Sequence, residues 1–138
     1  MIPNDAATHA VRQNGTDRSR GRASLIALWV LQVALAALFL MAGGSKLAGV
    51  PDMVTMFDKL GLGQWFRYVT GAIEATSGIL LLVPSAAVFG ALLLIPTMVG
   101  AIITNVFVVP ASPVMPLLLL IGAVVVAWAR RDRLRLLF

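Results

Sequence analysis

The chain has no cysteine and a single histidine, His9, which lies in a polar N-terminal segment. The absence of cysteine excludes disulfides, cysteine-ligated iron–sulfur clusters and thiol chemistry. Because His9 lies outside the apolar part of the chain, no haem or zinc site is expected there, and no metal ligands are assigned. If the protein takes part in redox chemistry, the electron carrier must come from another molecule.

Charged side chains are also scarce. Only 12% of the 138 residues are charged and 59% are hydrophobic, whereas a soluble domain carries about 25% charged residues. Contact with lipid explains a surface that lacks half of its usual charge. Since each membrane-spanning helix needs about 20 residues, the length allows four or at most five spans and no separate soluble domain. The sequence therefore predicts an all-α integral membrane protein.

The net charge of +5 could suggest a nucleic-acid partner, but the positions of the arginines argue against it. They form two clusters that flank the apolar region: Arg18, Arg20 and Arg22 before it, and Arg130, Arg131, Arg133 and Arg135 after it. This distribution is typical of cytoplasmic flanks beside anionic lipid headgroups. The expected partner is the lipid bilayer and not nucleic acid.

Four apolar runs predict a membrane domain over residues 23–131, with spans at about 24–47, 67–83, 86–109 and 114–130. A disordered cytoplasmic tail is expected over residues 1–22 and a basic tail over 132–138. Pro96 lies near the middle of the third span and has no N–H to donate to the carbonyl of Leu92, so a kink is expected there.

Residues 50–66 separate the first two spans and predict a short amphipathic helix that Gly61 ends. Met53, Phe57 and Leu60 are spaced to share one face. An amphipathic helix followed by aromatic residues is typical of the boundary between water and lipid, where we expect this segment to lie. The fold class is thus a four-helix membrane bundle with one interfacial helix between spans 1 and 2.

An even number of spans places both termini on the same side. That side carries about eight Lys and Arg residues and the other about three, so the positive-inside rule places both termini in the cytoplasm. The expected location is the inner (cytoplasmic) membrane, which the chain crosses several times.

Glu74 is the only acidic residue inside the second apolar run. An ionised carboxylate in hydrocarbon costs roughly 2.5 kcal/mol or more, so Glu74 must face the protein interior beside a partner or remain protonated. Lys46, at the end of the first run, is the basic residue best placed to reach it. Gly71 and Gly78 share the face of Glu74, which indicates that this face packs against another helix.

Other polar residues fall near the same outer level of the membrane: Arg67 at the start of the second span, and Thr104 and Asn105 near the end of the third. Three interpretations of the Lys46–Glu74 pair remain open. It is a buried ion pair that fixes helix register, or part of a polar pocket where Glu74, the candidate catalytic residue, binds a ligand or moves a proton, or a contact with a partner subunit.

The order of these motifs resembles the DoxX-like family of small four-helix membrane proteins. The resemblance rests on the run from Leu38 to Leu47, which includes Lys46, on the Gly71-x-x-Glu74-x-x-x-Gly78 pattern, and on the stretch from Met98 to Ile102. It covers roughly residues 24–131. It implies a compact inner-membrane protein, of a kind that is associated in some relatives with quinone-coupled sulfur oxidation and in others with redox or stress-related complexes.

The leading hypothesis is a non-catalytic subunit or accessory protein of a membrane redox or stress-related system, in which Lys46 and Glu74 form the central polar pair. Whether the chain is an enzyme is left open. One alternative is a quinone- or lipid-binding oxidoreductase subunit in which Glu74 accepts a proton and Lys46 holds a ligand oxygen. The other is a small proton-coupled transporter. No resident cofactor is evident, a quinone fits the second hypothesis, and a soluble redox protein or a second copy of the chain is the expected protein partner.

Overall fold

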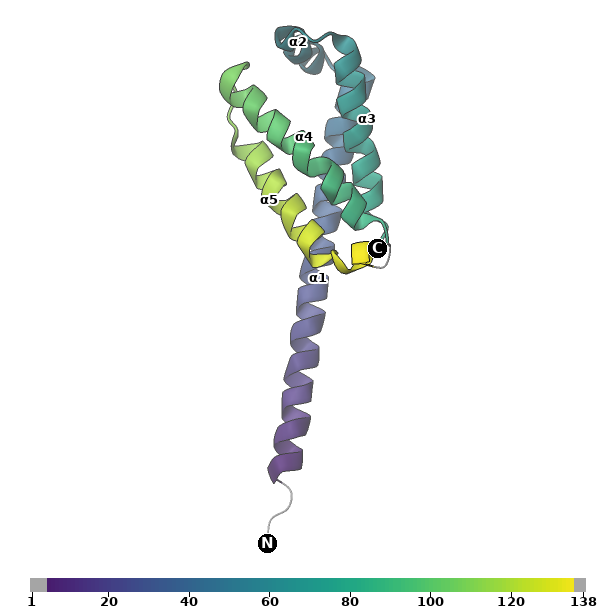
Figure 1. The fold of residues 1–138 in the computed structure, drawn as a ribbon, viewed down its shortest axis with the longest axis vertical. Coiled ribbons are helices and arrows are strands. Elements are labelled where there is room, and N and C mark those ends of the chain that lie inside the picture. The colour runs from purple at the N-terminus through teal and green to yellow at the C-terminus, as the bar shows by residue number, and fades with distance from the viewer. Residues whose placement is uncertain (1–4, 136–138) are drawn as a thin grey trace. The chain divides into compact units, whose positions relative to one another are not determined.

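The computed structural model describes residues 5–135, except for the side chain of Arg133, and all regular elements in this range are helices. The outermost residues of the two predicted tails, 1–4 and 136–138, lie outside the described residues. Figure 1 shows the helices, which are α1 (Asp5–Ala48), α2 (Pro51–Leu60), α3 (Gln64–Leu81), α4 (Ala87–Phe107), α5 (Val114–Ala129) and the short α6 (Asp132–Arg135). The prediction of an all-α chain is confirmed.

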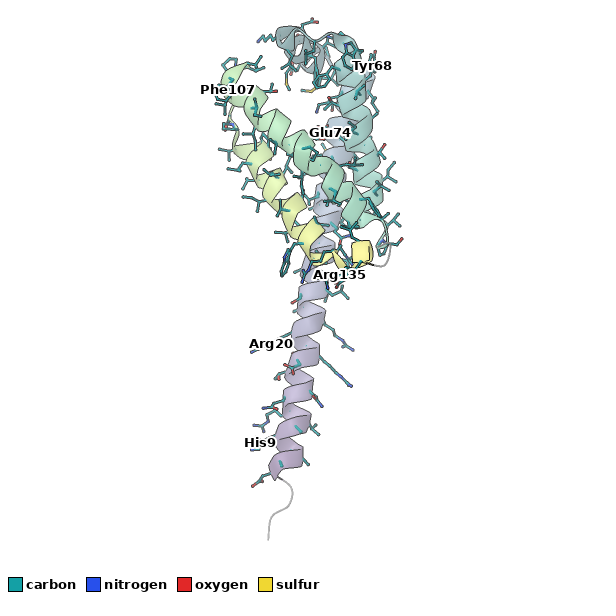
Figure 2. All side chains as sticks on the ribbon, in the orientation of Figure 1. His9, Arg20, Tyr68, Glu74, Phe107 and Arg135 are labelled. Atoms are coloured by element: carbon teal, nitrogen blue, oxygen red, sulfur yellow. The ribbon has the colours of Figure 1, made fainter. Side chains whose placement is uncertain are left out.

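The chain divides into two units, residues 1–30 and 31–138. In the first unit α1 is helical from Asp5, which replaces the disordered tail expected over residues 1–22. Its polar side chains, including His9 and Arg20 in Figure 2, are exposed. Helix nucleation is the unfavourable step, and each further residue adds a hydrogen bond. A helix already formed by the apolar run from Ala23 can therefore continue backwards through a segment that would not start a helix itself.

In the second unit the helix bounds lie close to the predicted spans. The ends of α3, α4 and α5 differ from the expected limits by at most three residues. By length and composition, α1 and α4 can cross a membrane, and α5 is a shorter apolar helix. Pro96 lies inside α4, where the hydroxyl of Thr97 donates a hydrogen bond of 2.8 Å to the carbonyl of Leu93, one turn earlier.

Helix α2 has the amphipathic character that its sequence predicts. Pro51 occupies its first turn, where a missing N–H is tolerated, and Gly61 ends it in the left-handed conformation with φ 72°. Phe57 is buried and its ring packs 6.0 Å from the ring of Phe66 on α3, whereas Asp58 and Lys59 are exposed. The apolar face of α2 is therefore held against the start of α3.

The backbones of α1 and α3 approach closely at glycines. A Cβ atom at Gly43 would lie 2.6 Å from the backbone nitrogen of Ala75 and 2.7 Å from the carbonyl oxygen of Gly71. A Cβ at Gly78 would lie 3.1 Å from the carbonyl oxygen of Ala36. Small residues of this kind allow helices to pack backbone to backbone. The face that carries Gly71, Glu74 and Gly78 is thus the face that α3 presents to α1.

Two further glycines mark the other helix contacts. A Cβ at Gly90 of α4 would lie 2.8 Å from the carbonyl oxygen of Ser77 on α3, and one at Gly122 of α5 would meet the side chain of Leu35 on α1 at 3.1 Å. Helix α4 packs on both α3 and α5, and Figure 1 shows α4 and α5 running side by side. The core lies between these helices and contains Phe39, Leu81, Leu94 and Val126.

A second polar junction occupies the end of α3 opposite Lys46. The buried amide of Gln32 donates a 2.9 Å hydrogen bond to the carbonyl of Leu81 at the end of α3, and its oxygen accepts one of 2.9 Å from Nε of Arg130. Gln32 thereby satisfies a carbonyl that the end of a helix leaves without an internal partner.

The contact at Gly43 generates a prediction with a matched control. Gly43→Ala should destabilise the protein by roughly 1–3 kcal/mol, because a methyl group there forces apart two backbones. Gly44→Ala, one residue later, meets no atom within 4 Å and should be neutral or stabilising by up to about 1 kcal/mol. Thermal unfolding of both variants in mild detergent measures the difference. Equal stabilities would contradict the close packing of α1 on α3.

Candidate functional site

The structure joins Lys46 and Glu74 in a buried ion pair. Nζ of Lys46 lies 2.9 Å from Oε2 of Glu74, and only 9% of Lys46 and 3% of Glu74 is exposed. The stem of Lys46 passes over Gly71, where a Cβ atom would lie 2.9 Å from Cβ of Lys46. The glycine in the turn before Glu74 therefore gives the lysine room to reach the carboxylate.

Arg67 belongs to the same cluster. Its Nη1 donates a hydrogen bond to the backbone carbonyl of Lys46, and its Nε donates one of 2.7 Å to Oε1 of Gln64. The guanidinium also lies over the ring of Tyr68, 4.3 Å from its centre. Arg67 thus binds the end of α1 to the first turn of α3, and the last carbonyls of α1 gain a cationic donor.

Gln64 extends this network to α2. Its Nε2 donates to Oδ1 of Asp58 at 2.6 Å and to the carbonyl of Val54 at 3.0 Å. A continuous chain of polar contacts therefore runs from Asp58 through Gln64 and Arg67 to Lys46 and then to Glu74. It fixes α1, α2 and α3 relative to one another on the side of the carboxylate.

A pocket of about 460 Å³ lies beside this cluster, between α2, α3 and α4. Its volume is within the range of small-molecule sites. Glu74, whose position on α3 is labelled in Figure 2, is one of the residues in the pocket wall. Among the described residues, those that line the pocket are Met56, Phe57, Leu60, Leu62, Phe66, Val69, Thr70, Ile73, Glu74, Leu93, Pro96, Thr97, Gly100, Ala101 and Thr104. Glu74 is the one charged residue among them, so the pocket is apolar apart from a single carboxylate and three hydroxyls.

The two oxygens of Glu74 have different environments. Oε2 accepts the hydrogen bond from Lys46, whereas Oε1 has no hydrogen-bond donor within residues 31–135. Glu74 lines the pocket, in contrast to the hydroxyl of Ser77, which is buried without a partner among the described residues. Because a buried acceptor without a donor is unfavourable, a hydrogen bond donated to Oε1 would be favourable at this site.

The remaining candidate residues divide between this site and other places. Thr104 lines the pocket opposite α3, but Lys46 and Arg67 do not line it. Lys46 is therefore placed to hold Glu74, and its role in holding a ligand oxygen stays a prediction. Asn105 lies outside the pocket, and its amide donates a 2.9 Å hydrogen bond to the carbonyl of Ser112 in the loop before α5.

Comparison with known proteins agrees with this architecture. The sequence profile of the DoxX-like family matches residues 30–128, which include the α1 face that carries Lys46 and all of α3, α4 and α2. The chain belongs to the DoxX-like family. It is therefore a DoxX-like membrane protein, as its apolar helices also indicate.

Among curated proteins, this DoxX-like chain is similar to one from Bacillus subtilis (strain 168) that is described as "Putative oxidoreductase CatD". The two are 33% identical over 75 residues, which represent 54% of this chain and 56% of the relative. The chain thus matches only about half of the relative's length. No solved structure matches the DoxX-like chain significantly.

Sequence reasoning missed several residues of the DoxX-like site. In the sequence, Gln64 is a single polar residue at the end of the segment between the first two spans, and nothing marks it as functional. Its position three residues before Arg67 would, however, place the two side chains on one helix face. The contribution of α2 to the pocket was also missed, because its sequence pattern indicates only a helix at the boundary between water and lipid. Thr97, which directly follows Pro96, carried no signal of its own.

The ion pair predicts strong coupling between its two members. Glu74→Gln should destabilise the protein by roughly 3 kcal/mol, because it leaves the ammonium of Lys46 buried without a counter-charge. Adding Lys46→Met to this variant should recover at least half of the loss, because no unpaired charge then remains. Thermal unfolding in detergent completes the double-mutant cycle. If the two changes are simply additive, the pair does not stabilise the contact between α1 and α3.

Proposed function

We propose that this DoxX-like protein binds a lipid-soluble small molecule of the quinone class in the pocket beside Glu74, as the integral membrane subunit of a redox system. The observation that carries the proposal is the apolar pocket of about 460 Å³ with a single carboxylate residue, Glu74, in its wall, of which Lys46 binds Oε2. Binding sites for small molecules combine such apolar linings with a few polar groups that orient the ligand.

One further observation supports a redox setting. In such a setting the electrons would come from a ligand or from a partner protein, because the chain has no cysteine and its one histidine lies far from the pocket in sequence. The relative from Bacillus subtilis carries the description of an oxidoreductase. A soluble redox protein is accordingly the partner that this proposal requires.

The residues of the site have different roles in this proposal. Glu74 contacts the ligand, and Thr104 faces it from α4. Lys46 and Arg67 are positioning residues, because Lys46 holds the carboxylate and Arg67 holds the end of α1 that carries Lys46. A purely structural role of the ion pair is the second candidate, which the close contact at Gly43 favours.

For the arrangement in the membrane, we propose a four-span bundle with spans within 24–47, 67–83, 86–109 and 114–130. At about 1.5 Å per residue, α3 and α5 are roughly 27 and 24 Å long, near the 30 Å thickness of the hydrocarbon core. A modest local thinning of the bilayer accommodates the difference. Helix α2 then lies at the outer interface, and both termini are on the cytoplasmic side of the inner membrane.

Filling the pocket tests the binding proposal. Gly100 lines the pocket and a Cβ atom there meets nothing within 4 Å, so Gly100→Leu should occupy part of the space without disturbing the helix. We expect a short-chain quinone to quench the fluorescence of Trp65 saturably in lipid nanodiscs, because the Trp65 ring lies 5.7 Å from the ring of Phe66 in the pocket wall. Gly100→Leu should weaken this binding at least about tenfold.

Gly44→Leu is the matched control. Gly44 is exposed on α1, outside the pocket, and has the same open surroundings. The Gly44→Leu variant should bind the quinone as the unaltered protein does. Replacing Trp65 with Phe should remove the signal and so assign it to this ring. Unsaturable quenching, or equal binding by both leucine variants, would contradict a quinone site in the pocket.

The absence of cysteine makes the topology directly measurable. Two exposed positions suit single cysteines: Ser85, between α3 and α4, and Ala111, between α4 and α5. In the proposed arrangement they lie on opposite sides of the membrane. In intact spheroplasts a membrane-impermeant maleimide should label Ala111→Cys at once and Ser85→Cys only after lysis. The reverse pattern would contradict termini in the cytoplasm.

A further inference from the structure

The polar groups of the pocket are almost all hydrogen-bond acceptors. Oε1 of Glu74 belongs to a carboxylate that is ion-paired with Lys46 through its other oxygen, so it can only accept. The hydroxyls of Thr70 and Thr97 already donate their protons to carbonyls of their own helices, at 2.8 Å to Phe66 and 2.8 Å to Leu93. Their oxygens are left with lone pairs alone.

Thr104 is the exception. Its hydroxyl has no hydrogen-bond partner among the described residues and can donate or accept. Neither Lys46 nor Arg67 lines the pocket. Nζ of Lys46 donates to Glu74, Nε of Arg67 donates to Gln64, and Nη1 of Arg67 donates to the backbone carbonyl of Lys46. A ligand in the pocket therefore meets one strong acceptor at Glu74 and at most one side-chain donor, at Thr104.

The charge of the cluster restricts the ligand further. The Glu74 carboxylate is already neutralised by Lys46, and Arg67 lies next to them, bonded to the backbone of Lys46. A cationic donor such as an ammonium would add uncompensated positive charge to an apolar site, which is unfavourable. An anion would bring negative charge against Oε1. The favoured donor is a neutral hydroxyl group.

From this arrangement we infer that the pocket selects ligands that carry a neutral hydroxyl donor on an apolar body. It therefore binds a phenol, or the reduced, hydroxyl-bearing form of a quinone couple, in preference to the oxidised carbonyl form. The hydroxyl donates to Oε1 of Glu74. A quinone can present only carbonyl oxygens there, which leaves Oε1 without a donor and brings two acceptors together. This inference rests on the proposed pocket and names its ligand class.

Discrimination of this kind is large in buried sites. A site that is built to hydrogen-bond a ligand hydroxyl rejects the analogue that lacks it, because its own polar group is then left unpaired. A hydrogen bond to a charged acceptor is also stronger than one between neutral groups. We expect a preference of about tenfold or more for the hydroxyl form. For a two-electron couple, a tenfold preference raises the midpoint potential of the bound couple by about 30 mV.

Four matched ligands test the inference on the full chain in lipid nanodiscs under anaerobic conditions. They are an alkyl-substituted hydroquinone, the corresponding quinone, the dimethyl ether of the hydroquinone, and the equivalent monophenol. Calorimetric titration should show that the hydroquinone and the monophenol bind about tenfold or more tightly than the quinone and the ether. The ether removes the donor without changing the oxidation state, and the monophenol shows whether one hydroxyl is sufficient.

Variants then assign the preference to Glu74. In Glu74→Gln the amide oxygen can accept from Lys46 and the amide nitrogen becomes a donor toward the pocket, so the order should reverse in favour of the quinone. If that variant does not fold, Lys46→Met combined with Glu74→Gln serves instead and should bring the preference below about threefold. Thr104→Val leaves the ion pair intact and should weaken all oxygen-bearing ligands alike without changing their order.

The outcomes separate the inference from the proposed function. Equal affinities for the hydroquinone, the quinone and the ether in the unaltered protein would overturn the selection while leaving a binding pocket. Tightest binding of an alkylammonium of the same size would overturn the choice of a neutral donor. An unchanged preference in the folded Glu74 variants would remove Glu74 as its source. If none of these ligands binds, both the inference and the proposed site fail.

Discussion

The hydrogen-bonded ion pair between Lys46 and Glu74 is the interaction on which the rest of the site depends. A carboxylate among apolar helices is tolerated only beside a partner, and this partner reaches it because Gly43 and Gly71 let α1 and α3 touch along their backbones. The charge requirement and the close packing therefore support each other. Replacing either glycine with a residue that has a Cβ atom would move the lysine away from the carboxylate. Replacing the lysine with a neutral residue would leave the carboxylate unpaired within the packed face.

The pair also determines the chemistry of the neighbouring pocket. Lys46 occupies one oxygen of Glu74, and Glu74 is the charged residue in the wall of the pocket between α2, α3 and α4. Helix α2 is part of this site and not only a linker, because Phe57 packs on Phe66 and Gln64 bonds to both Asp58 and Arg67. The series of polar contacts that runs from α2 to Glu74 fixes the position of the pocket wall relative to the carboxylate. This is the preorganisation that selective binding needs.

Much of the fold could be predicted because lipid imposes a simple pattern on a sequence. Long apolar runs, their limits, the helix before Gly61 and the shared face of Glu74, Gly71 and Gly78 all follow from composition and helical spacing. The pocket could not be predicted in this way, because it depends on how α2 folds back and on where α4 lies. The helix before residue 23 was missed, since residue composition does not report propagation from a neighbouring helix. The separation of Asn105 from Thr104 depends on side-chain direction, which membrane depth does not indicate.

The most direct test of this account is the distance between the two charged groups in a lipid bilayer. Glu74 is the only glutamate in the chain, and Lys46 and Lys59 are the only lysines, so selective labelling with ¹³C-glutamate and side-chain ¹⁵N-lysine gives an unambiguous solid-state NMR measurement. The account predicts strong dipolar coupling between one lysine nitrogen and the glutamate carboxyl carbon, as expected for the 2.9 Å contact of Nζ with Oε2, and its loss in Lys46→Met. Absence of this coupling in the unaltered protein would contradict the account.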